Sequence, residues 1–342
     1  WAFGELLAFG TLLAQGVTVR LCGQDCRRGT FVQRHAVVFD SRTGAEHVPL
    51  ASVARDDARF FVYDSLLSEF AAMGFEYGYS VENPDALVVW EAQFGDFANG
   101  AQIVIDEFIT SGERKWGQRS SLTVLLPHGH EGQGPDHTSG RPERWLQLAA
   151  EDNMRLANPT TPANFFHLLR RQALSPKRKP LVVFTPKSLL RHRDCVSAVE
   201  EFTSGGFRPV IGDDTVDPAA VRRVMLCSGK VYYDLVRARE ERGVTDTALV
   251  RLEQLYPLPV EEVRAALAAY PHAEDFAWVQ EEPANQGAWS FIALNLLEHL
   301  DGVRLRRISR PAAAAPAVGS PKAHEVEQEV LLEAAFPRRR TG

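Results

Sequence analysis

The sequence predicts an α/β protein with two domains, each a mostly parallel sheet flanked by helices. Segments with helical periodicity alternate with short apolar segments along most of the chain, and most of the apolar segments are continuous runs. Continuous runs are typical of parallel strands that are covered on both faces. A length of 342 residues, of which 45% are hydrophobic and 24% charged, is sufficient for two such domains.

The first predicted domain covers residues 1–186. It begins with an amphipathic helix at 3–15, and Gly16 should end this helix because glycine readily adopts the left-handed conformation required there. The strands predicted in this domain are 17–21, 36–39, 60–63, 86–90, 122–127, 155–157 and 181–184. Its further helices are predicted at 64–78, at 101–112, at 145–151 and in a segment that ends at residue 173.

A linker is predicted at 187–218, where the chain is first basic and then rich in Gly, Ser and Asp. The second predicted domain covers 219–342 and again alternates strands with helices. Its predicted strands are 224–227, 247–252, 276–280 and 303–308, and its predicted helices are 231–242, 260–270, 290–300 and 325–335. The segment 310–320 is too rich in proline for a helix.

The helix at 64–78 holds the acidic residue of greatest interest, Glu69. Asp64 is the expected N-cap, since its carboxylate can accept hydrogen bonds from the first free N–H groups of the helix. A buried apolar stripe is predicted for this helix from the helical spacing of Leu66, Phe70, Met73 and Tyr77. Glu69 lies on the same side, so it is either a solvated residue at the edge of the stripe or a buried acid with a raised pKa.

Composition excludes several classes of protein. The net charge of −6 gives no electrostatic footprint for nucleic acid, and no apolar run reaches the roughly 18 residues of a membrane span. Four cysteines in a chain of this length, and no secretory signal, predict a reducing, cytoplasmic location. The first residue is Trp1 rather than Met and it leads directly into a helical pattern, so we expect a segment from a longer protein.

Long polar loops follow the predicted strands that end at Leu21, Trp90 and Leu126. Ligands bind at the carboxyl ends of parallel strands, so we expect the functional site at these loops. The third loop is rich in glycine and carries His128, His130, Glu131, Asp136 and His137. These side chains could hold a metal ion, could order the loop, or could contact an anionic substrate or move protons.

Other candidate residues are equally open to two interpretations. The first loop carries Arg27, Arg28, Arg34 and His35. This basic set could bind a carboxylate or phosphate, or it could be a solvated loop. Glu281 and Glu282 could do acid–base chemistry or lie on a loop surface. Cys22 and Cys26 lack further ligands at zinc spacing and are expected to be structural thiols, and no glycine-rich nucleotide motif is present.

Several long motifs resemble one family when they are taken together and in order. They are GQDCRRGTFVQRHAVV, DSLLSEFAAMGFEYGY, WEAQFGDFANGAQ, LLPHGHEGQGPDHTSGR, PLVVFTPKSLLRH, CSGKVYYDL, RLEQLYPLP and WVQEEPANQGAW. The chain resembles the C-terminal half of the decarboxylating component of 2-oxoglutarate dehydrogenase, in the style of the actinobacterial multifunctional 2-oxoglutarate metabolism enzymes. The resemblance covers nearly the whole chain.

This resemblance implies a transketolase-type pyrimidine-binding domain followed by a C-terminal domain. Thiamine diphosphate would lie between the pyrimidine domain of one protomer and the diphosphate-binding domain of its dimer mate. Glu69 matches the cofactor-activating glutamate, Phe97 matches an aromatic residue that stacks on the aminopyrimidine, and Leu67 is expected to contact the cofactor as well. His137 matches a histidine that reaches cofactor and substrate, and His35 matches a loop near the substrate entrance. Arg34 matches the same entrance loop.

The resemblance also implies the chemistry. A protonated Glu69 would donate to a pyrimidine nitrogen and so favour the tautomer that activates the thiazolium carbon for decarboxylation of 2-oxoglutarate. The succinyl group would pass to the lipoyl group of a succinyltransferase in the tricarboxylic acid cycle. No metal site is then expected in this chain, because the family holds Mg²⁺ and the diphosphate through a GDG…N motif that is absent here. The chain alone is therefore expected to be inactive and to bind the cofactor weakly.

Two further expectations concern regulation and alternatives. Actinobacterial relatives bind acetyl-CoA partly through basic residues after the QLYPLP-type stretch, whereas this chain has Glu261 and Glu262 there and retains Arg171. The acidic pair should repel the phosphates of CoA, which counts against activation by acetyl-CoA. The main alternative function is a non-catalytic subunit or remnant that acts in assembly, and a metal-dependent hydrolase is a distant third.

Overall fold

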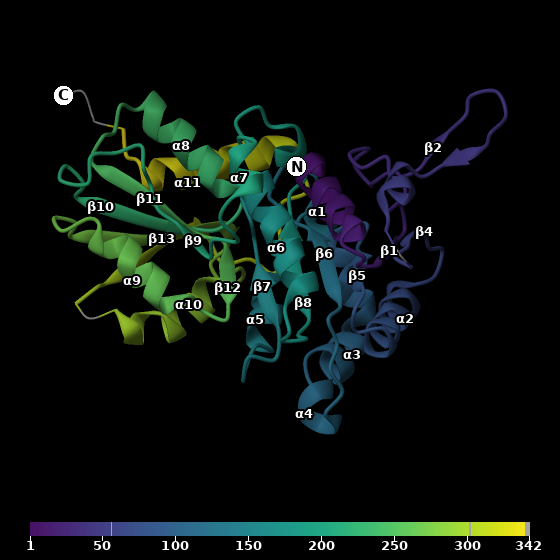
Figure 1. Cartoon of the computed structure of the whole chain (residues 1–342). Coiled ribbons are helices and arrows are strands. Elements are labelled where there is room, and N and C mark those ends of the chain that lie inside the picture. Colours follow the sequence, from purple (N-terminus) through teal and green to yellow (C-terminus); the bar gives the residue numbers. More distant parts are fainter. Residues whose placement is uncertain (56, 301, 339–342) are drawn as a thin grey trace. The chain divides into compact units, whose positions relative to one another are not determined.

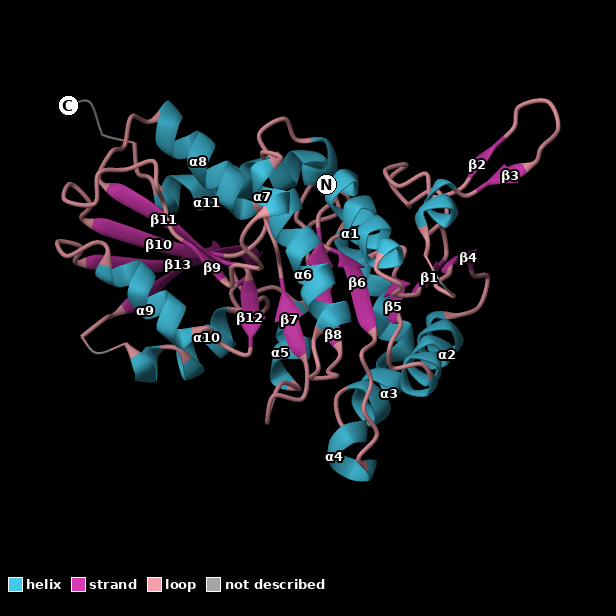
Figure 2. Ribbon diagram, viewed as in Figure 1, coloured by secondary structure: helices cyan, strands magenta, loops and turns pink. Residues whose placement is uncertain are grey.

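The structure is a computed structural model that describes residues 1–55, 57–300 and 302–338. The chain divides into two compact units. The first unit comprises 1–127, 148–155 and 161–207, and the second comprises 128–147, 156–160 and the described residues from 208 onward. Each unit contains a mostly parallel sheet flanked by helices (Figures 1 and 2), which confirms the predicted α/β class. The predicted limits 1–186, 187–218 and 219–342, the last of which includes residues outside the described part, stay a prediction.

In the first unit, strands pair in the order β8-β6-β5-β1-β4, and every neighbouring pair is parallel. Their bounds are Val19–Gly23 (β1), Phe60–Asp64 (β4), Leu87–Glu91 (β5), Thr123–Pro127 (β6) and Leu181–Thr185 (β8). Every residue of β5, β6 and β8 is buried, as the continuous apolar runs predicted. Because β6, β5 and β1 are parallel neighbours, their carboxyl ends meet at one edge of the sheet, where we expected the site.

Helices α1 and α6 of the first unit pack against each other (Figure 2). α1 spans Ala2–Ala14 and α6 spans Pro162–Leu174. A Cβ at Gly4 would lie 2.4 Å from the Pro162 carbonyl oxygen, so glycine is required for this close approach. Gly16 follows α1 in the left-handed conformation, with φ 85°, as predicted. The other elements of this unit include α4 (Gly112–Trp116), α7 (Glu200–Thr203), η1 (Pro49–Val53), η5 (Ser188–Arg191) and the β2–β3 hairpin (Val38–Phe39 and Glu46–His47).

The helix that carries Glu69, α2, begins later than predicted. It spans Glu69–Glu82, and its N-cap is Ser68, whose hydroxyl accepts a hydrogen bond from the Ala71 N–H. The prediction of Asp64 as the N-cap is wrong. Asp64 pairs with Gly23 of β1 as the last residue of β4, so its backbone is extended, and its carboxylate accepts from the Arg27 N–H.

The apolar stripe predicted for α2 is only half right. Leu66 precedes the helix and is 98% exposed, and Phe70 is 49% exposed, whereas Met73 and Tyr77 are buried. The helix starts at Glu69 rather than at Asp64, and its buried face is made by Ala72, Met73, Glu76, Tyr77 and Ser80. Glu76 is buried because it forms a bidentate ion pair with Arg20, with N–O distances of 2.7 and 2.8 Å.

Changing Ser68 to alanine should lower the free energy of unfolding by about 0.5–1 kcal/mol, because the Ala71 N–H loses its side-chain acceptor. Urea unfolding at neutral pH measures this loss. Ser68→Asp should restore the stability, since aspartate is an equally good N-cap. An aspartate variant as unstable as the alanine variant would show that Ser68 is not the cap.

In the second unit, strands pair in the order β14-β13-β10-β11-β9, and β9 alone in this order is antiparallel to its neighbour. The strands span Val210–Ile211 (β9), Arg223–Cys227 (β10), Thr247–Leu252 (β11), Asp275–Pro283 (β13) and Leu305–Arg310 (β14). β12 (Gln254–Tyr256) pairs with the second-unit part of β7 (Arg155–Ala157) in the antiparallel direction. The helices are α5 (Pro142–Gln147), α8 (Val231–Glu241), α9 (Val260–Ala268), α10 (Trp289–Asn295) and α11 (Pro321–Ala335).

The core of the second unit lies between this sheet and helices α8 and α11. Buried side chains in this cluster include Met225, Leu235, Leu249, Val279, Ile308, Leu331 and Phe336. α11 begins earlier than predicted, at Pro321, because Ser320 caps it and proline is well suited to the first turn. No helix among residues 1–55, 57–300 and 302–338 is long and apolar enough to cross a membrane.

Two other segments differ from the prediction. The segment predicted as one helix at 101–112 is divided into α3 (Gln102–Val104) and a π-helical turn, η3 (Ile105–Ile109). β13 continues through Glu281 and Glu282, which were predicted to lie in a loop, and both side chains are buried. Partners from other segments satisfy these carboxylates, and no local sequence signal reveals such partners.

Candidate functional site

A solvent-open pocket with about 260 Å³ of empty space lies at the carboxyl edge of the first unit's sheet. It is lined by residues that follow β1, β4 and β5 or begin α2: Gly23, Gln24, Ser65, Leu67, Glu69, Ala72, Trp90, Glu91 and Gln93. The loop predictions after Leu21 and Trp90 therefore meet at one pocket, and two of the predicted site residues, Leu67 and Glu69, are in its wall.

Glu69 occupies the first turn of α2 and is half-buried. Its carboxylate lies against Gly100, because a Cβ at that glycine would be 3.2 Å from Glu69 Oε2. α2 packs against η2 (Gly95–Ala101), and this packing positions the two segments. The surroundings of Glu69 are less apolar than the predicted stripe implied. Leu66 and Phe70 point to solvent. The pocket wall is mixed, because it contains the polar residues Gln24, Ser65 and Gln93 as well as the apolar residues Leu67 and Trp90.

Phe97 lies in η2, the same segment that supports Glu69, and is half-buried. Its ring packs edge-on against Phe94 at a centroid distance of 5.8 Å, and Phe94 in turn packs edge-on against Phe31 at 5.5 Å. The aromatic chain links η2 to the loop that follows β1. The contact between α2 and η2 places Glu69 against the segment that carries Phe97, and Leu67 lies in the pocket wall with Glu69.

Arg34 has a role that the sequence did not predict. It is fully buried and holds Glu91 with two hydrogen bonds of 2.8 and 2.6 Å and Glu5 with two more. Its guanidinium also donates to the Cys26 carbonyl oxygen, at 3.0 Å. The prediction of a solvated Arg34 is therefore wrong, and the carboxylates that Arg34 binds belong to the chain itself. A signal in the sequence could have predicted this role. Glu5 and Glu91 lie at positions of apolar elements that are expected to be buried, and buried carboxylates need a cation as a partner.

His35 follows Arg34 directly and is exposed, with a left-handed backbone at φ 48°. The backbone N–H groups of Arg34 and His35 both donate to the Arg28 carbonyl oxygen, at 3.0 Å. The buried Arg34 side chain therefore anchors the turn from which His35 projects.

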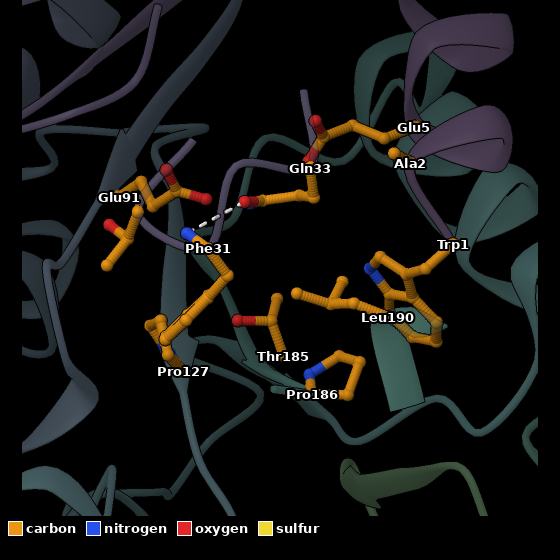
Figure 3. A pocket seen from close by; sticks show the side chains of 11 residues that line it. Trp1, Ala2, Glu5, Phe31, Gln33, Glu91, Pro127, Thr185, Pro186 and Leu190 are labelled. Carbon is orange, nitrogen blue, oxygen red and sulfur yellow. Dashed lines mark hydrogen bonds between the residues drawn. The ribbon is translucent and has the colours of Figure 1, made fainter. Parts of the chain in front are cut away.

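A second cavity, with about 340 Å³ of empty space, lies beside the Arg34 cluster (Figure 3). Glu5 and Glu91 line it together with Trp1, Phe31, Gln33, Thr185, Leu190 and others. The Phe31 N–H donates to Gln33 Oε1 at 3.0 Å, the bond drawn in Figure 3. Glu91 lines both cavities. The carboxylates that Arg34 neutralises are thus among the polar groups that line this second cavity.

The histidine loop belongs to the second unit. His128 Nε2 lies 3.0 Å from Glu282 Oε1, and the His130 backbone N–H donates to Glu281 Oε1 at 2.9 Å. Lys230 Nζ lies 2.8 Å from Glu281 Oε2 and 2.8 Å from the Asp234 carboxylate. His137 is half-buried and ends a short 3₁₀ turn, η4 (Pro135–His137). The structure therefore separates His128 and His130, which are docked on buried carboxylates, from His137.

The described ranges contain no group of three His, Cys, Asp or Glu side chains placed to hold a metal ion. Cys22 and Cys26 are buried thiols, and burial, with Glu76 nearby, raises the pKa of Cys22 to about 12. A thiol with such a pKa is not ionised at neutral pH, which agrees with the structural role predicted for it.

Glu281 should make the second unit acid-sensitive. Burial alone would raise its pKa, but the Lys230 ammonium and the His130 side chain hold the pKa well below its usual range. A carboxyl with a depressed pKa in the folded state adds stability that is complete above its unfolded pKa of about 4.3 and is lost as the pH falls through the folded pKa. The free energy of unfolding should therefore decrease on acidification below about pH 4.5.

Glu281→Gln should reduce this acid dependence, measured by urea unfolding at several pH values between about 3 and 7. Glu298→Gln is the matched control, because Glu298 is an exposed glutamate of the same unit whose side chain is 66% accessible. Equal slopes for the wild type and Glu281→Gln would contradict the assignment.

Comparisons with known proteins were made for the whole chain. Residues 1–193 match the family model of the transketolase pyrimidine-binding domain, and residues 196–336 match that of the 2-oxoglutarate dehydrogenase C-terminal region. The "Multifunctional 2-oxoglutarate metabolism enzyme" of Mycobacterium sp. (strain KMS) is 56% identical over 98% of this chain, which corresponds to 28% of that protein. The "2-oxoglutarate dehydrogenase E1 component" of Cupriavidus necator is 54% identical over 99% of this chain, which corresponds to 36% of that protein.

Proposed function

From the premise that the chain belongs to the 2-oxoglutarate dehydrogenase branch of the thiamine-dependent transketolase family, we propose that it supplies half of the active site of a 2-oxoglutarate dehydrogenase. The chain corresponds to the C-terminal part of its relatives. The chain spans only 28–36% of these relatives. The reaction we propose for the assembled enzyme is decarboxylation of 2-oxoglutarate with transfer of the succinyl group to a lipoyl group.

The observation that carries this proposal is the placement of Glu69 in the wall of the pocket at the sheet edge. Gly100 leaves room for its carboxylate, and a side chain there would approach Oε2 to 3.2 Å. Leu67 adds an apolar group that is 63% exposed and so available to a ligand. A carboxyl, an apolar side chain and the nearby Phe97 ring are a suitable set for a flat heteroaromatic ring such as the aminopyrimidine of thiamine diphosphate.

When bound, the cofactor would supply a carbon nucleophile and an electron sink for the electron pair that stays behind when CO₂ leaves. The residues of this chain position it and move protons. We assign to Glu69 a hydrogen bond from its carboxyl group into the pocket, and to Phe97 a ring face for stacking. We assign His137 to the substrate carboxylate or to proton transfer, and His35 to the substrate entrance.

The ligands of Mg²⁺ and of the diphosphate are assigned to the part of the relatives that this chain does not cover. The chain alone should therefore bind thiamine diphosphate weakly and release no CO₂ from 2-oxoglutarate. Calorimetric titration of the chain with thiamine diphosphate and Mg²⁺ tests the first point, and binding in the micromolar range would contradict it.

The decisive experiment mixes the chain with the N-terminal part of the Mycobacterium relative that it does not cover. Release of CO₂ from 2-oxoglutarate, dependent on thiamine diphosphate, would support the enzyme. A stable complex without turnover would support the alternative, a non-catalytic subunit or remnant that acts in assembly. The N-terminal part alone is the control for background release.

The assembled protein is proposed to be a cytoplasmic homodimer with active sites at the interface and to act on a lipoyl-bearing succinyltransferase. We do not propose that acetyl-CoA activates this protein. Glu261 and Glu262 lie exposed in the first turn of α9 and would oppose phosphate groups there. Arg171 is stacked over Phe207 within the first unit, at 4.2 Å from the ring centroid.

A further inference from the structure

A cluster of buried charged side chains in the second unit has no part in the mechanism above. It comprises Lys230, Glu281 and Glu282, with His128 and His130 of the glycine-rich loop docked on the two carboxylates. Burying so many ionisable groups costs desolvation energy, and each pairing must compensate for it. The two histidine pairings tie the loop at 128–140 to strand β13, and Lys230, the N-cap residue of α8, pairs with Glu281 of the same strand.

The hydrogen bonds of His128 define the tautomer of its ring. The backbone N–H of Gly140 points at Nδ1 from 3.0 Å, so Nδ1 must accept and carries no proton. Nε2 therefore carries the proton and donates it to Glu282 Oε1, at 3.0 Å. A carboxylate is an acceptor only, so Glu282 and the Gly140 N–H both select the same tautomer.

The same bonds close the loop on itself. His128 begins the loop, Gly140 ends it, and the imidazole ring joins them, while the Gly129 N–H donates to the Thr138 carbonyl oxygen at 2.9 Å. Near the start of the loop, the His130 N–H donates to Glu281, and the His130 Nε2 lies 3.0 Å from the Pro316 carbonyl oxygen. A Cβ at Gly129 would lie 3.2 to 3.7 Å from Glu131, Glu281 and Lys230, so the backbone is packed directly onto the charged cluster.

We infer that Glu282 is a positioning residue: by fixing His128 in the Nε2–H tautomer, it locks the loop at 128–140 in the single conformation that presents His137. Glu281, neutralised by Lys230, supports the start of the loop by accepting from the His130 N–H. This inference rests on the proposed function for the role of His137. The tautomer of His128 and the order of the loop are inferred from the hydrogen bonds alone and do not depend on the proposed function.

Nitrogen-15 NMR of the histidine rings and hydrogen exchange of the backbone amides, both on the chain as it is, test the inference. In the wild type, His128 should show a protonated Nε2 and an unprotonated Nδ1, and the Gly140 amide should be protected. In Glu282→Ala, that tautomer preference should weaken, because only the Gly140 N–H then selects it, and exchange at Gly140 should accelerate by about tenfold or more. Glu282→Gln should keep both signatures, since its amide oxygen still accepts from Nε2.

Glu298→Ala is the control, because Glu298 is a surface glutamate whose Oε1 lies 3.8 Å from His299 Nε2, with both side chains exposed. It should change neither signal. In the enzyme reconstituted with the N-terminal part of the relative, Glu282→Ala should lower kcat by about tenfold or more with little change in KM for 2-oxoglutarate, and Glu282→Gln should restore most of the rate.

The outcomes separate the two proposals. A wild-type chain with the Nε2–H tautomer and a protected Gly140, but no CO₂ release after reconstitution, counts against the proposed function alone. A reconstituted enzyme that is active while Glu282→Ala leaves the tautomer, the Gly140 exchange rate and kcat unchanged overturns the positioning role. A wild-type His128 that carries its proton on Nδ1 overturns it as well, without any variant.

Discussion

Glu69→Ala should lower the rate of CO₂ release by the reconstituted enzyme at least about 100-fold, because a positioned proton donor contributes about 10²–10⁴-fold to such reactions. The carboxyl stands in the pocket wall, and Gly100 leaves it the room to remain there. Truncation of Glu69 to alanine removes the carboxyl group but leaves the N-cap of α2 in place, since Ser68 makes that cap. Rates of CO₂ release at saturating 2-oxoglutarate and thiamine diphosphate measure the effect.

Glu82→Ala is the matched control, because Glu82 is an exposed glutamate at the far end of the same helix. It should retain full activity, and both variants should unfold at the wild-type urea concentration within error. An active Glu69→Ala enzyme would remove Glu69 from the mechanism. A Glu69→Ala variant that is inactive because it is unfolded would be recognised by its urea midpoint and by loss of the complex with the N-terminal part.

Gly100→Ala provides an independent approach to the same residue. Its Cβ would approach Glu69 Oε2 to 3.2 Å, which is tighter than ordinary contact, so the carboxylate must move. We expect its effect on the rate to be smaller than that of Glu69→Ala but in the same direction. The comparison tests whether the position of the carboxyl matters as well as its presence.

Arg34→Met should destabilise the first unit by about 3–5 kcal/mol, because removing one partner of a buried ion pair leaves the other charge uncompensated. Arg34 is the cation for both Glu5 and Glu91, and all three side chains are buried. Methionine keeps much of the volume and removes the charge. Urea unfolding, monitored by tryptophan fluorescence, measures the change.

Arg28→Met is the control for Arg34→Met. Arg28 lies in the same loop, its side chain is 53% accessible, and its N–O distance to Asp25 is 3.7 Å. Its loss should cost less than about 1 kcal/mol, as for other surface ion pairs. The triple variant Arg34→Met, Glu5→Leu and Glu91→Leu should recover a large part of the lost stability, because it removes the unpaired charges as well. An Arg34→Met protein of wild-type stability would show that the two carboxylates do not need this cation.

The sequence alone was sufficient for the parts of the fold that depend on neighbouring residues. Continuous apolar runs predicted β5, β6 and β8, and Gly16 predicted the end of α1, because local composition and backbone conformation decide both. The order of motifs predicted the family, which the comparisons confirm. Parallel strand order then places the carboxyl ends of β1 and β5 side by side, and the pocket with Leu67 and Glu69 in its wall lies at this edge of the sheet.

Local signals were misleading where a distant partner decides the outcome. Asp64 is a good N-cap by type, yet its pairing with β1 keeps it in a strand, and Ser68 caps the helix instead. Arg34 and Glu281 look like solvated loop residues in the sequence. Both are buried, because carboxylates or a lysine from segments far along the chain neutralise them.

By itself, then, the sequence determined the α/β class, the family and the edge of the sheet at which the first-unit pocket lies, because periodicity and motif order are properties of short segments. Only the tertiary structure decided which ionisable groups are free to do chemistry. It buries Arg34, His128 and His130 against carboxylates. It also leaves Glu69 in the wall of a solvent-open pocket. The physical reason is that the state of a charged side chain depends on the partners and the burial that folding brings to it, and these come from residues as far as 186 positions away.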